Sequence, residues 1–262
     1  MTVTVEREVV YSRPSGFRPL ALDLYVPAAP RALCVFLHGG GWRVGDRHEE
    51  PMPGFYSYVA EAGLAIASVD YRLSAEAVYP AQSSDVAAAL AFLADLGLGL
   101  GLGLGLGRTV VWGLSAGGHL AALAALSAGR DRIAAAVCWY PPTDFDALAK
   151  DIEDAGGTGD RSASSREGQL IGASLDDRPD LAAAASPVHH VRPGAPPFLF
   201  LHGTADLAVP PRQSRRLAEA LTAAGGSATV ELIPGAGHMF PQLDEAATRA
   251  LVDRSVGFLL TA

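Results

Sequence analysis

Hydrophobic residues follow two patterns along the chain. Residues 2–11 and 18–27 alternate between apolar and polar side chains, which is typical of strands with one face in solvent. Later segments are continuous apolar runs, typical of strands buried on both faces of a parallel sheet. These runs are residues 31–37, 64–71, 108–113, 133–141, 196–203 and 228–234. Together the two patterns predict a sheet of about eight strands.

Segments with apolar residues at helical spacing lie between most of these runs. They are residues 57–63, 79–95, 116–129, 210–225 and 243–260. Alternating strands and helices predict an α/β fold, with a mostly parallel central sheet covered by helices on both faces. The first two strands would form an antiparallel pair at one edge. We expect a single domain over residues 1–262, with a loop-rich insertion at about 142–187 that lacks a strand pattern.

Six consecutive Leu-Gly pairs, residues 96–107, separate a predicted helix from a predicted strand. Twelve residues are too few to cross a bilayer, and glycine at every second position weakens a helix. The run therefore predicts a surface connection whose first residues continue the preceding helix. An extra extended segment is a competing interpretation, because leucine recurs every two residues.

Composition restricts the partners and the compartment. The chain is 49% hydrophobic with a formal net charge of −8 and no cluster of Lys and Arg, which argues against nucleic acid and membranes as partners. The N-terminus, MTVTVEREVV, lacks the pattern of a secretory signal, so we expect a cytoplasmic protein. Cys34 and Cys138 lie in apolar runs, where buried reduced thiols are expected and a disulfide is the alternative. The sequence has no zinc signature, and we expect no metal and no other cofactor.

The strongest chemical signal is the G-x-S-x-G pattern around Ser115, GLSAG. It follows a predicted strand and precedes a predicted helix, which is the context of a nucleophilic serine held on a sharp turn. The alternative is a glycine-rich turn with an incidental serine.

A serine nucleophile needs a base, and the base needs an orienting acid. Asp206 and His238 each come just after a predicted strand, and the carboxyl ends of parallel strands meet at one edge of a sheet. Ser115 lies at the same edge. Asp144 is the alternative acid. The remaining histidines lie in less suitable contexts: His48, His119, His189, His190 and His202.

The stretch LHGGGW, which ends at Trp42, also follows a buried strand. Its three glycines allow the backbone to approach a ligand, and their N–H groups can point to one spot. A developing oxyanion needs such donors. The alternative is a flexible glycine turn.

Together these residues resemble the α/β-hydrolase fold, in particular the HGGG-type esterases related to hormone-sensitive lipase. HGGGWRVGDR and YRLSAEAVYPAQ are similar to the small acyl esterases grouped with feruloyl and acetyl-xylan esterases and with kynurenine formamidase. The resemblance covers almost the whole chain. It implies Ser115 as nucleophile, His238 as base and Asp206 as its partner. It also implies an oxyanion hole made by the N–H groups of three residues: Gly40, Gly41 and Ala116.

Two departures from the hormone-sensitive-lipase group concern the space around the serine. Leu114 occupies the position before the nucleophile where that group usually has Asp. Only 37 residues precede His38, and they are predicted as strands, so we expect no N-terminal cap domain. Trp42 and Leu114 are the residues that we expect to line the substrate pocket.

These observations predict a serine carboxylesterase that hydrolyses small acyl esters through an acyl-enzyme. The alternative on the same machinery is an arylformamidase similar to kynurenine formamidase. A non-enzymatic ligand receptor on a hydrolase fold is a third hypothesis, although such receptors usually lack a member of the triad and none is missing here. The expected partner is a small-molecule ester. The sequence leaves the oligomeric state open, a homodimer included.

Overall fold

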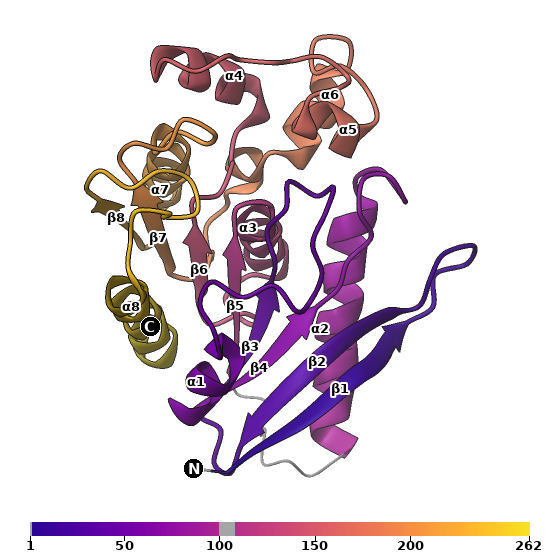
Figure 1. Cartoon of the computed structure of the whole chain (residues 1–262). Coiled ribbons are helices and arrows are strands. Elements are labelled where there is room, and N and C mark those ends of the chain that lie inside the picture. The colour runs from indigo at the N-terminus through magenta and orange to yellow at the C-terminus, as the bar shows by residue number, and fades with distance from the viewer. Residues whose placement is uncertain (1, 100–107) are drawn as a thin grey trace.

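The computed structural model describes residues 2–99 and 108–262, whose strands form one eight-stranded sheet (Figure 1). The order across the sheet is β1-β2-β4-β3-β5-β6-β7-β8. The strands are β1 Val3–Ser12, β2 Leu20–Pro27, β3 Ala32–Leu37, β4 Leu64–Val69, β5 Thr109–Leu114, β6 Ala136–Trp139, β7 Phe198–Gly203 and β8 Ala228–Ile233.

The first two strands form the antiparallel edge that the alternating pattern predicts. β1 pairs antiparallel with β2 and is mostly exposed, and β2 pairs antiparallel with β4. All remaining pairs are parallel. Strands β3 to β7 are buried, apart from the half-buried Thr109 at the start of β5, as their continuous apolar sequences predict.

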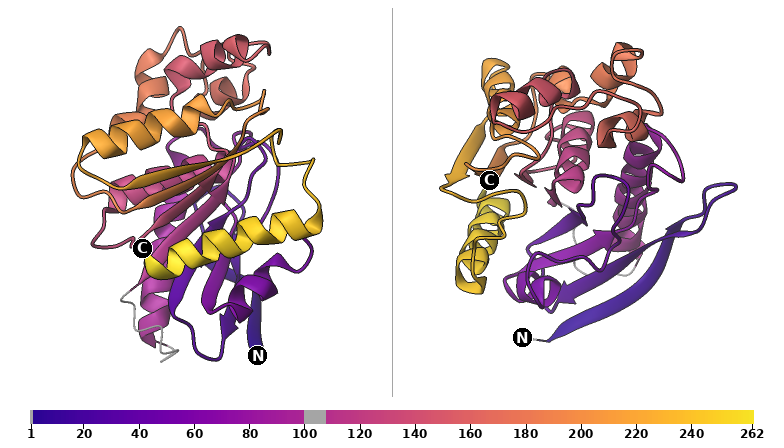
Figure 2. Two further views of the ribbon diagram at one scale, coloured as in Figure 1. Left: turned by 90° about the vertical axis from the view of Figure 1, so that its left-hand side faces the viewer. Right: turned by 45° about the horizontal axis from the view of Figure 1, so that its top comes forward.

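Helices cover both faces of the sheet (Figure 2), and the two-residue period of each strand divides the core between them. On β3, Val35 and Leu37 pack toward α2, α3 and α7, whereas Cys34 and Phe36 pack toward α1 and α8. The helices are α1 Phe55–Glu61, α2 Ala81–Gly99, α3 Ala116–Ala128, α7 Arg212–Ala223 and α8 Glu245–Thr261. All five correspond to segments with helical spacing in the sequence.

The two cysteines are buried, free thiols, as the sequence predicts. Cys34 lies on the α1/α8 face of β3, and Cys138 lies on the opposite face of β6. Strand β5 separates β3 from β6. Two strand spacings amount to about 10 Å, which is too far for a disulfide.

Helix α2 extends to Gly99, so the first residues of the Leu-Gly run continue the preceding helix, as predicted. Leu96 packs against the core on the α2/α3 face. Residues 100–107 of the run lie outside the described residues. Within the described part of the chain, every helix is too short or too polar to cross a bilayer.

The prediction of a loop-rich insertion at about 142–187 was wrong about its secondary structure. The segment contains α4 Phe145–Asp154, α5 Arg166–Ile171 and α6 Pro179–Ala185, followed by the 3-10 helix η1 Pro187–His190. The Asp144 side chain caps α4, and the Ser165 hydroxyl caps α5. These helices lie above the carboxyl ends of the parallel strands (Figure 1). Helices α5 and α6 span six and seven residues, too few to show a clear apolar periodicity, whereas α4 has an amphipathic sequence that the prediction overlooked.

Candidate active site

Ser115 occupies the sharp turn between β5 and α3, with φ 51° and ψ −116°. Its flanking glycines are required by packing. A Cβ atom on Gly117 would lie 2.0 Å from the carbonyl oxygen of Leu37, and one on Gly113 would lie 2.1 Å from that of Gly117. The two glycines of the G-x-S-x-G pattern therefore let the start of α3 pack closely against β3 and β5 on either side of the strained serine.

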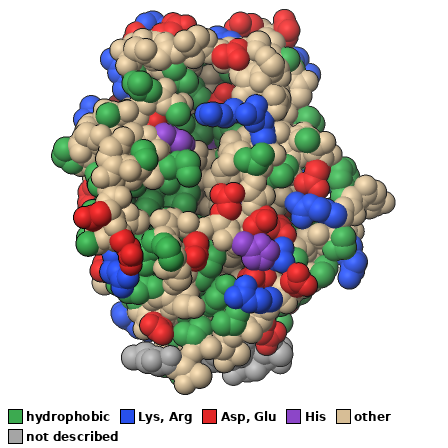
Figure 3. Space-filling model, in the orientation of Figure 1, with side chains coloured by type: hydrophobic (Ala, Val, Ile, Leu, Met, Phe, Trp, Pro, Cys, Tyr) green, Lys and Arg blue, Asp and Glu red, His purple; other side chains and the backbone are tan. Residues whose placement is uncertain are grey.

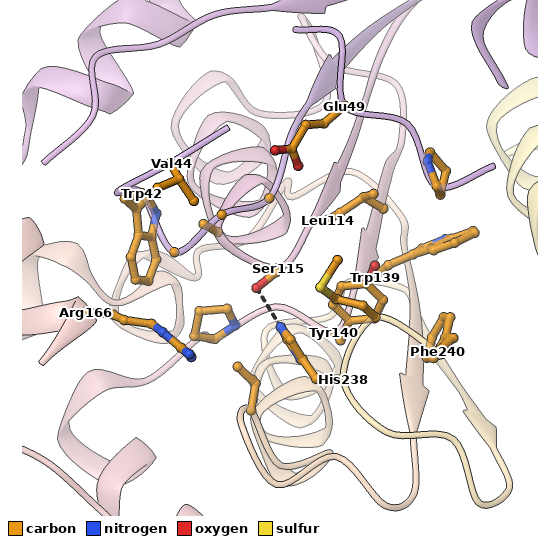
Figure 4. Close-up of a pocket in the computed structure, with 18 of the residues that line it drawn as sticks. Trp42, Val44, Glu49, Leu114, Ser115, Trp139, Tyr140, Arg166, His238 and Phe240 are labelled. Carbon is orange, nitrogen blue, oxygen red and sulfur yellow. Dashed lines mark hydrogen bonds between the residues drawn. The ribbon is translucent and has the colours of Figure 1, made fainter. Parts of the chain in front are cut away.

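His238 reaches Ser115 from the loop that follows β8 (Figure 4), and Asp206 reaches His238 from the loop that follows β7. The Ser115 Oγ lies 2.9 Å from His238 Nε2, and His238 Nδ1 lies 2.7 Å from Asp206 Oδ2. A carboxylate can only accept, so the Nδ1–H donates to Asp206 and Nε2 is left to accept the hydroxyl proton of Ser115. This is the tautomer that a general base needs.

Asp206 is buried, and both of its carboxylate oxygens accept hydrogen bonds. The residue is 1% exposed, and Oδ1 accepts the N–H groups of Ala208 and Val209 at 3.0 and 2.9 Å. Burial alone would raise the pKa of this carboxyl, but hydrogen bonds from His202 and His238 outweigh it and lower the pKa to about 2. The acid is therefore ionised at neutral pH.

His202 is buried and hydrogen-bonded and is not the base, in line with its less suitable context in the sequence. Its Nε2–H donates to the carbonyl of Val209 at 2.7 Å and also lies 3.4 Å from Asp206 Oδ2. Its Nδ1 lies 2.7 Å from the Ser214 hydroxyl. The ring ties the loop after β7 to α7.

The glycine loop after β3 borders the same cavity as Ser115. Gly40 and Gly41 have φ values of 104° and 60°, and a Cβ atom on Gly40 would lie 2.1 Å from the carbonyl oxygen of Val44. Across residues 2–99 and 108–262, the backbone N–H groups of Gly40, Gly41 and Ala116 donate to no other group of the protein. They are therefore available to a ligand oxygen in the cavity.

A buried histidine holds this loop against the helix of the nucleophile. The indole N–H of Trp42 donates to His119 Nδ1 at 3.2 Å, and His119 Nε2–H donates to the carbonyl of Ala185 at 2.7 Å. Burial lowers the pKa of His119 to about 4 and keeps the ring neutral. Trp42 borders the cavity but is 1% exposed, and its ring packs edge-on against His119 and Phe145.

The cavity in front of Ser115 has a volume of about 530 Å³. Figure 3 shows a hollow with hydrophobic side chains inside and a histidine at its edge. Leu114 borders it, as the sequence predicts. Sequence reasoning missed several further lining residues, which lie at the end of β6, after β6 and β8, in the loop before α1 and at the start of α5: Glu49, Trp139, Tyr140, Arg166, Met239 and Phe240. Tyr140 directly follows β6 with φ 41°, so position after a strand was its available signal.

Asp144, the alternative acid, takes no part in this arrangement. Its carboxylate caps α4 and lies 3.3 Å from Arg216 Nε. Asp144, Asp146 and His189 do place ligand atoms within 4.8 Å of one another. The Asp144 carboxylate is engaged by the helix and the arginine, however, and the other two side chains are exposed, so the cluster lacks the features of a built metal site.

The nucleophilic serine lies on a strand–helix turn, and its acid and base follow later strands of the same eight-stranded sheet. This arrangement defines the α/β-hydrolase fold. Within that fold the chain belongs to the BD-FAE family, whose model matches residues 22–221. This match confirms the resemblance to small HGGG-type esterases.

Two relatives from Mycobacterium tuberculosis are named esterases. Esterase LipC is 33% identical over 85% of this chain, and Esterase LipQ is 30% identical over 93%. The chain spans 56% and 60% of the lengths of these two proteins.

Solved structures with this fold include a truncated carbohydrate esterase from gut microbiota. It has a TM-score of 0.83 and 25% identity, and the match covers 99% of this chain and 97% of that one. Esterase Est2 of Thermogutta terrifontis has a TM-score of 0.74 and 26% identity over 98% of this chain and 91% of its own.

Proposed function

We propose that this chain is a serine carboxylesterase that hydrolyses short-chain acyl esters. The observation that carries the proposal is the Ser115–His238–Asp206 hydrogen-bond chain, which faces a cavity bordered by unpaired backbone N–H groups. The named esterase relatives support the same reaction class, and none of those given above is named a formamidase.

The first half of the proposed reaction acylates the serine. Ser115 Oγ attacks the ester carbonyl while His238 Nε2 takes the hydroxyl proton. The carbonyl oxygen becomes an oxyanion, and the free N–H groups of Gly40, Gly41 and Ala116 are the donors that stabilise it. His238 then returns the proton to the departing alcohol, which leaves Ser115 as an acyl ester.

The second half consumes one water. His238 takes a proton from the water, whose oxygen attacks the acyl carbonyl. When the tetrahedral intermediate collapses, the carboxylic acid leaves and Ser115 regains its proton from His238. Asp206 stays ionised throughout and stabilises the imidazolium that forms twice in each turnover.

Labelling and turnover of Ser115→Ala test this mechanism. A related esterase, Est2, has been solved phosphorylated by paraoxon. Paraoxon should therefore add one diethylphosphoryl group to the peptide that contains Ser115, as seen by mass spectrometry. Ser115→Ala should lose the label and about 10⁴-fold or more of kcat for 4-nitrophenyl butyrate, because triad members act as a unit. Unchanged turnover in a folded variant would falsify the assignment, and a wild-type protein without turnover would favour a ligand receptor.

We propose a preference for acyl chains of about two to six carbons, by analogy with the small acyl esterases that the chain resembles. The volume of about 530 Å³ supports a small acyl group, and Est2 has been solved with propionate and with butyrate bound. A series of 4-nitrophenyl esters from acetate to dodecanoate tests it. Faster hydrolysis of the long esters or of emulsified triglyceride would contradict it. N-Formylkynurenine in the same series tests the formamidase alternative.

A further inference from the structure

Two arginines lie on one rim of the cavity, and the proposed mechanism uses neither. Arg166 is the first residue of α5, and Arg43 follows Trp42 in the glycine loop. Figure 3 shows Lys/Arg side chains gathered beside the hollow, close to a histidine. In Figure 4 the Arg166 guanidinium extends from its helix into the cavity, toward the side where Ser115 and His238 meet.

The stem of Arg166 is held against the glycine loop. Its Cδ atom lies 3.0 Å from the position that a Cβ atom of Gly41 would occupy, so the missing side chain of Gly41 leaves room for this contact. The guanidinium itself, within residues 2–99 and 108–262, has no hydrogen-bond or ion-pair partner. Its neighbours Arg161 and Arg178 are different, because they pair with Asp176 and Asp180.

Among the described residues, no carboxylate near the cavity forms an ion pair with the Arg166 guanidinium. Glu49 reaches the cavity from the opposite side of Ser115 (Figure 4), and the Glu50 carboxylate accepts N–H groups at the start of α1. Glu167 is half-buried beside Arg166. Burial raises the pKa of its carboxyl above the usual range, against the attraction of the arginines Arg166 and Arg43.

We propose that Arg166, with Arg43 beside it, binds a carboxylate carried by the ester substrate, so that the enzyme prefers anionic esters to neutral ones of the same shape. This inference rests on the proposed esterase function. A guanidinium presents a planar fork of donors that matches a carboxylate. A substrate that fills the cavity also shields the pair from solvent, which strengthens it relative to a surface ion pair.

Two pairs of isosteric substrates locate the carboxylate. Mono-4-nitrophenyl glutarate and its glutaramate analogue differ only in a terminal carboxylate or carboxamide on the acyl side. The butyrate esters of 4-hydroxybenzoate and 4-hydroxybenzamide carry the same difference on the alcohol side. Each kcat/KM ratio, carboxylate over carboxamide, is compared between variant and wild type, so that differences in intrinsic reactivity cancel.

Arg166→Met keeps the apolar stem and removes the charge. In at least one pair we expect its carboxylate/carboxamide ratio to fall about tenfold or more, equivalent to about 1.4 kcal/mol. Arg43→Met should reduce the ratio less. Arg192→Met removes an exposed arginine outside the cavity and should keep the wild-type ratio.

Wild-type ratios in both pairs for a folded Arg166→Met would overturn the inference. Hydrolysis of 4-nitrophenyl butyrate by the wild type is measured in parallel. If that neutral ester is not hydrolysed, the proposed function itself has failed, and the two failures are distinguished.

Discussion

The single residue Asp206 determines which nitrogen of His238 faces the serine. Its carboxylate accepts the Nδ1–H and thereby leaves Nε2 free for the Ser115 hydroxyl. Because the pKa of Asp206 is about 2, this orientation persists over the pH range in which the enzyme would work.

Asp206→Asn should lower kcat for 4-nitrophenyl butyrate by about 10³- to 10⁴-fold, because an amide can donate to Nδ1 and favour the wrong tautomer. The variant should remain folded, since Asn is close in shape. Steady-state kinetics on variant and wild type measure the effect. Asp144→Asn is the matched control, because Asp144 caps α4 away from His238 and Asn caps helices well. Full activity in Asp206→Asn together with loss in Asp144→Asn would reverse the assignment of the acid.

Some residues of the site could be predicted from the sequence and others could not. Ser115 directly follows β5, and Asp206 and His238 lie in the loops after β7 and β8, so one local pattern locates each of them at the same sheet edge. Arg166 has no such pattern. Its place depends on how α5 folds back over Gly41, a contact between residues 125 positions apart (166 − 41).

Among the helices, α3 and α8 show opposite uses of glycine. On α3, the backbone of β3 fills the space where a side chain of Gly117 would lie. On α8, the exposed Gly257 has nothing within 4 Å of a Cβ position and an ordinary helical backbone. Glycine inside a helix costs about 0.5–1 kcal/mol relative to alanine.

Gly257→Ala should therefore raise the free energy of unfolding by about 0.5–1 kcal/mol and leave esterase activity unchanged. Gly117→Ala should be strongly destabilising, because its Cβ atom would lie 2.0 Å from the Leu37 carbonyl oxygen. Urea denaturation followed by circular dichroism compares the two. Equal stability of the two variants would show that the Ser115 turn relaxes more easily than its packing implies.

The strands and long helices could be predicted because their periodicity is long and regular, whereas the short helices α5 and α6 could not. Helix α5 spans six residues and begins at a serine cap, so its sequence, REGQLI, differs little from a polar loop. In α4 the signal was present: Asp144 precedes FDALAKDIED, an amphipathic segment with a capping residue.

His119 connects three parts of the molecule that are far apart in the sequence: the glycine loop, α4 and the end of α6. It lies on α3, accepts the indole N–H of Trp42 in the glycine loop and donates to Ala185 at the end of α6. Its ring also stacks on Phe145 of α4 at 5.2 Å between centroids. Protonation of this buried ring would break the bond from Trp42.

The stability of the folded state should consequently fall as the pH drops from about 6.5 to about 4, the interval between the ordinary and the lowered pKa of His119. Below 6.5 the unfolded chain binds a proton that the folded ring resists, so the contribution is present above 6.5 and lost toward 4. The full interval corresponds to about 3 kcal/mol. Burial also lowers the pKa of His38, which acts in the same direction.

Urea denaturation at several pH values measures this loss. His119→Gln should show a flatter dependence than the wild type, whereas His189→Gln, at an exposed site, should follow the wild type. Identical slopes for His119→Gln and wild type would mean that another group controls acid sensitivity.

The positions of the two free thiols provide an internal measurement of how the protein opens. Cys34 faces the α1/α8 layer and Cys138 the α2/α3/α7 layer, and the sequence contains two cysteines in all. A thiol reagent can modify each one only when the helices on its own side move away. Peptide-resolved labelling rates would therefore show whether the two layers detach together, as in all-or-none unfolding, or one before the other.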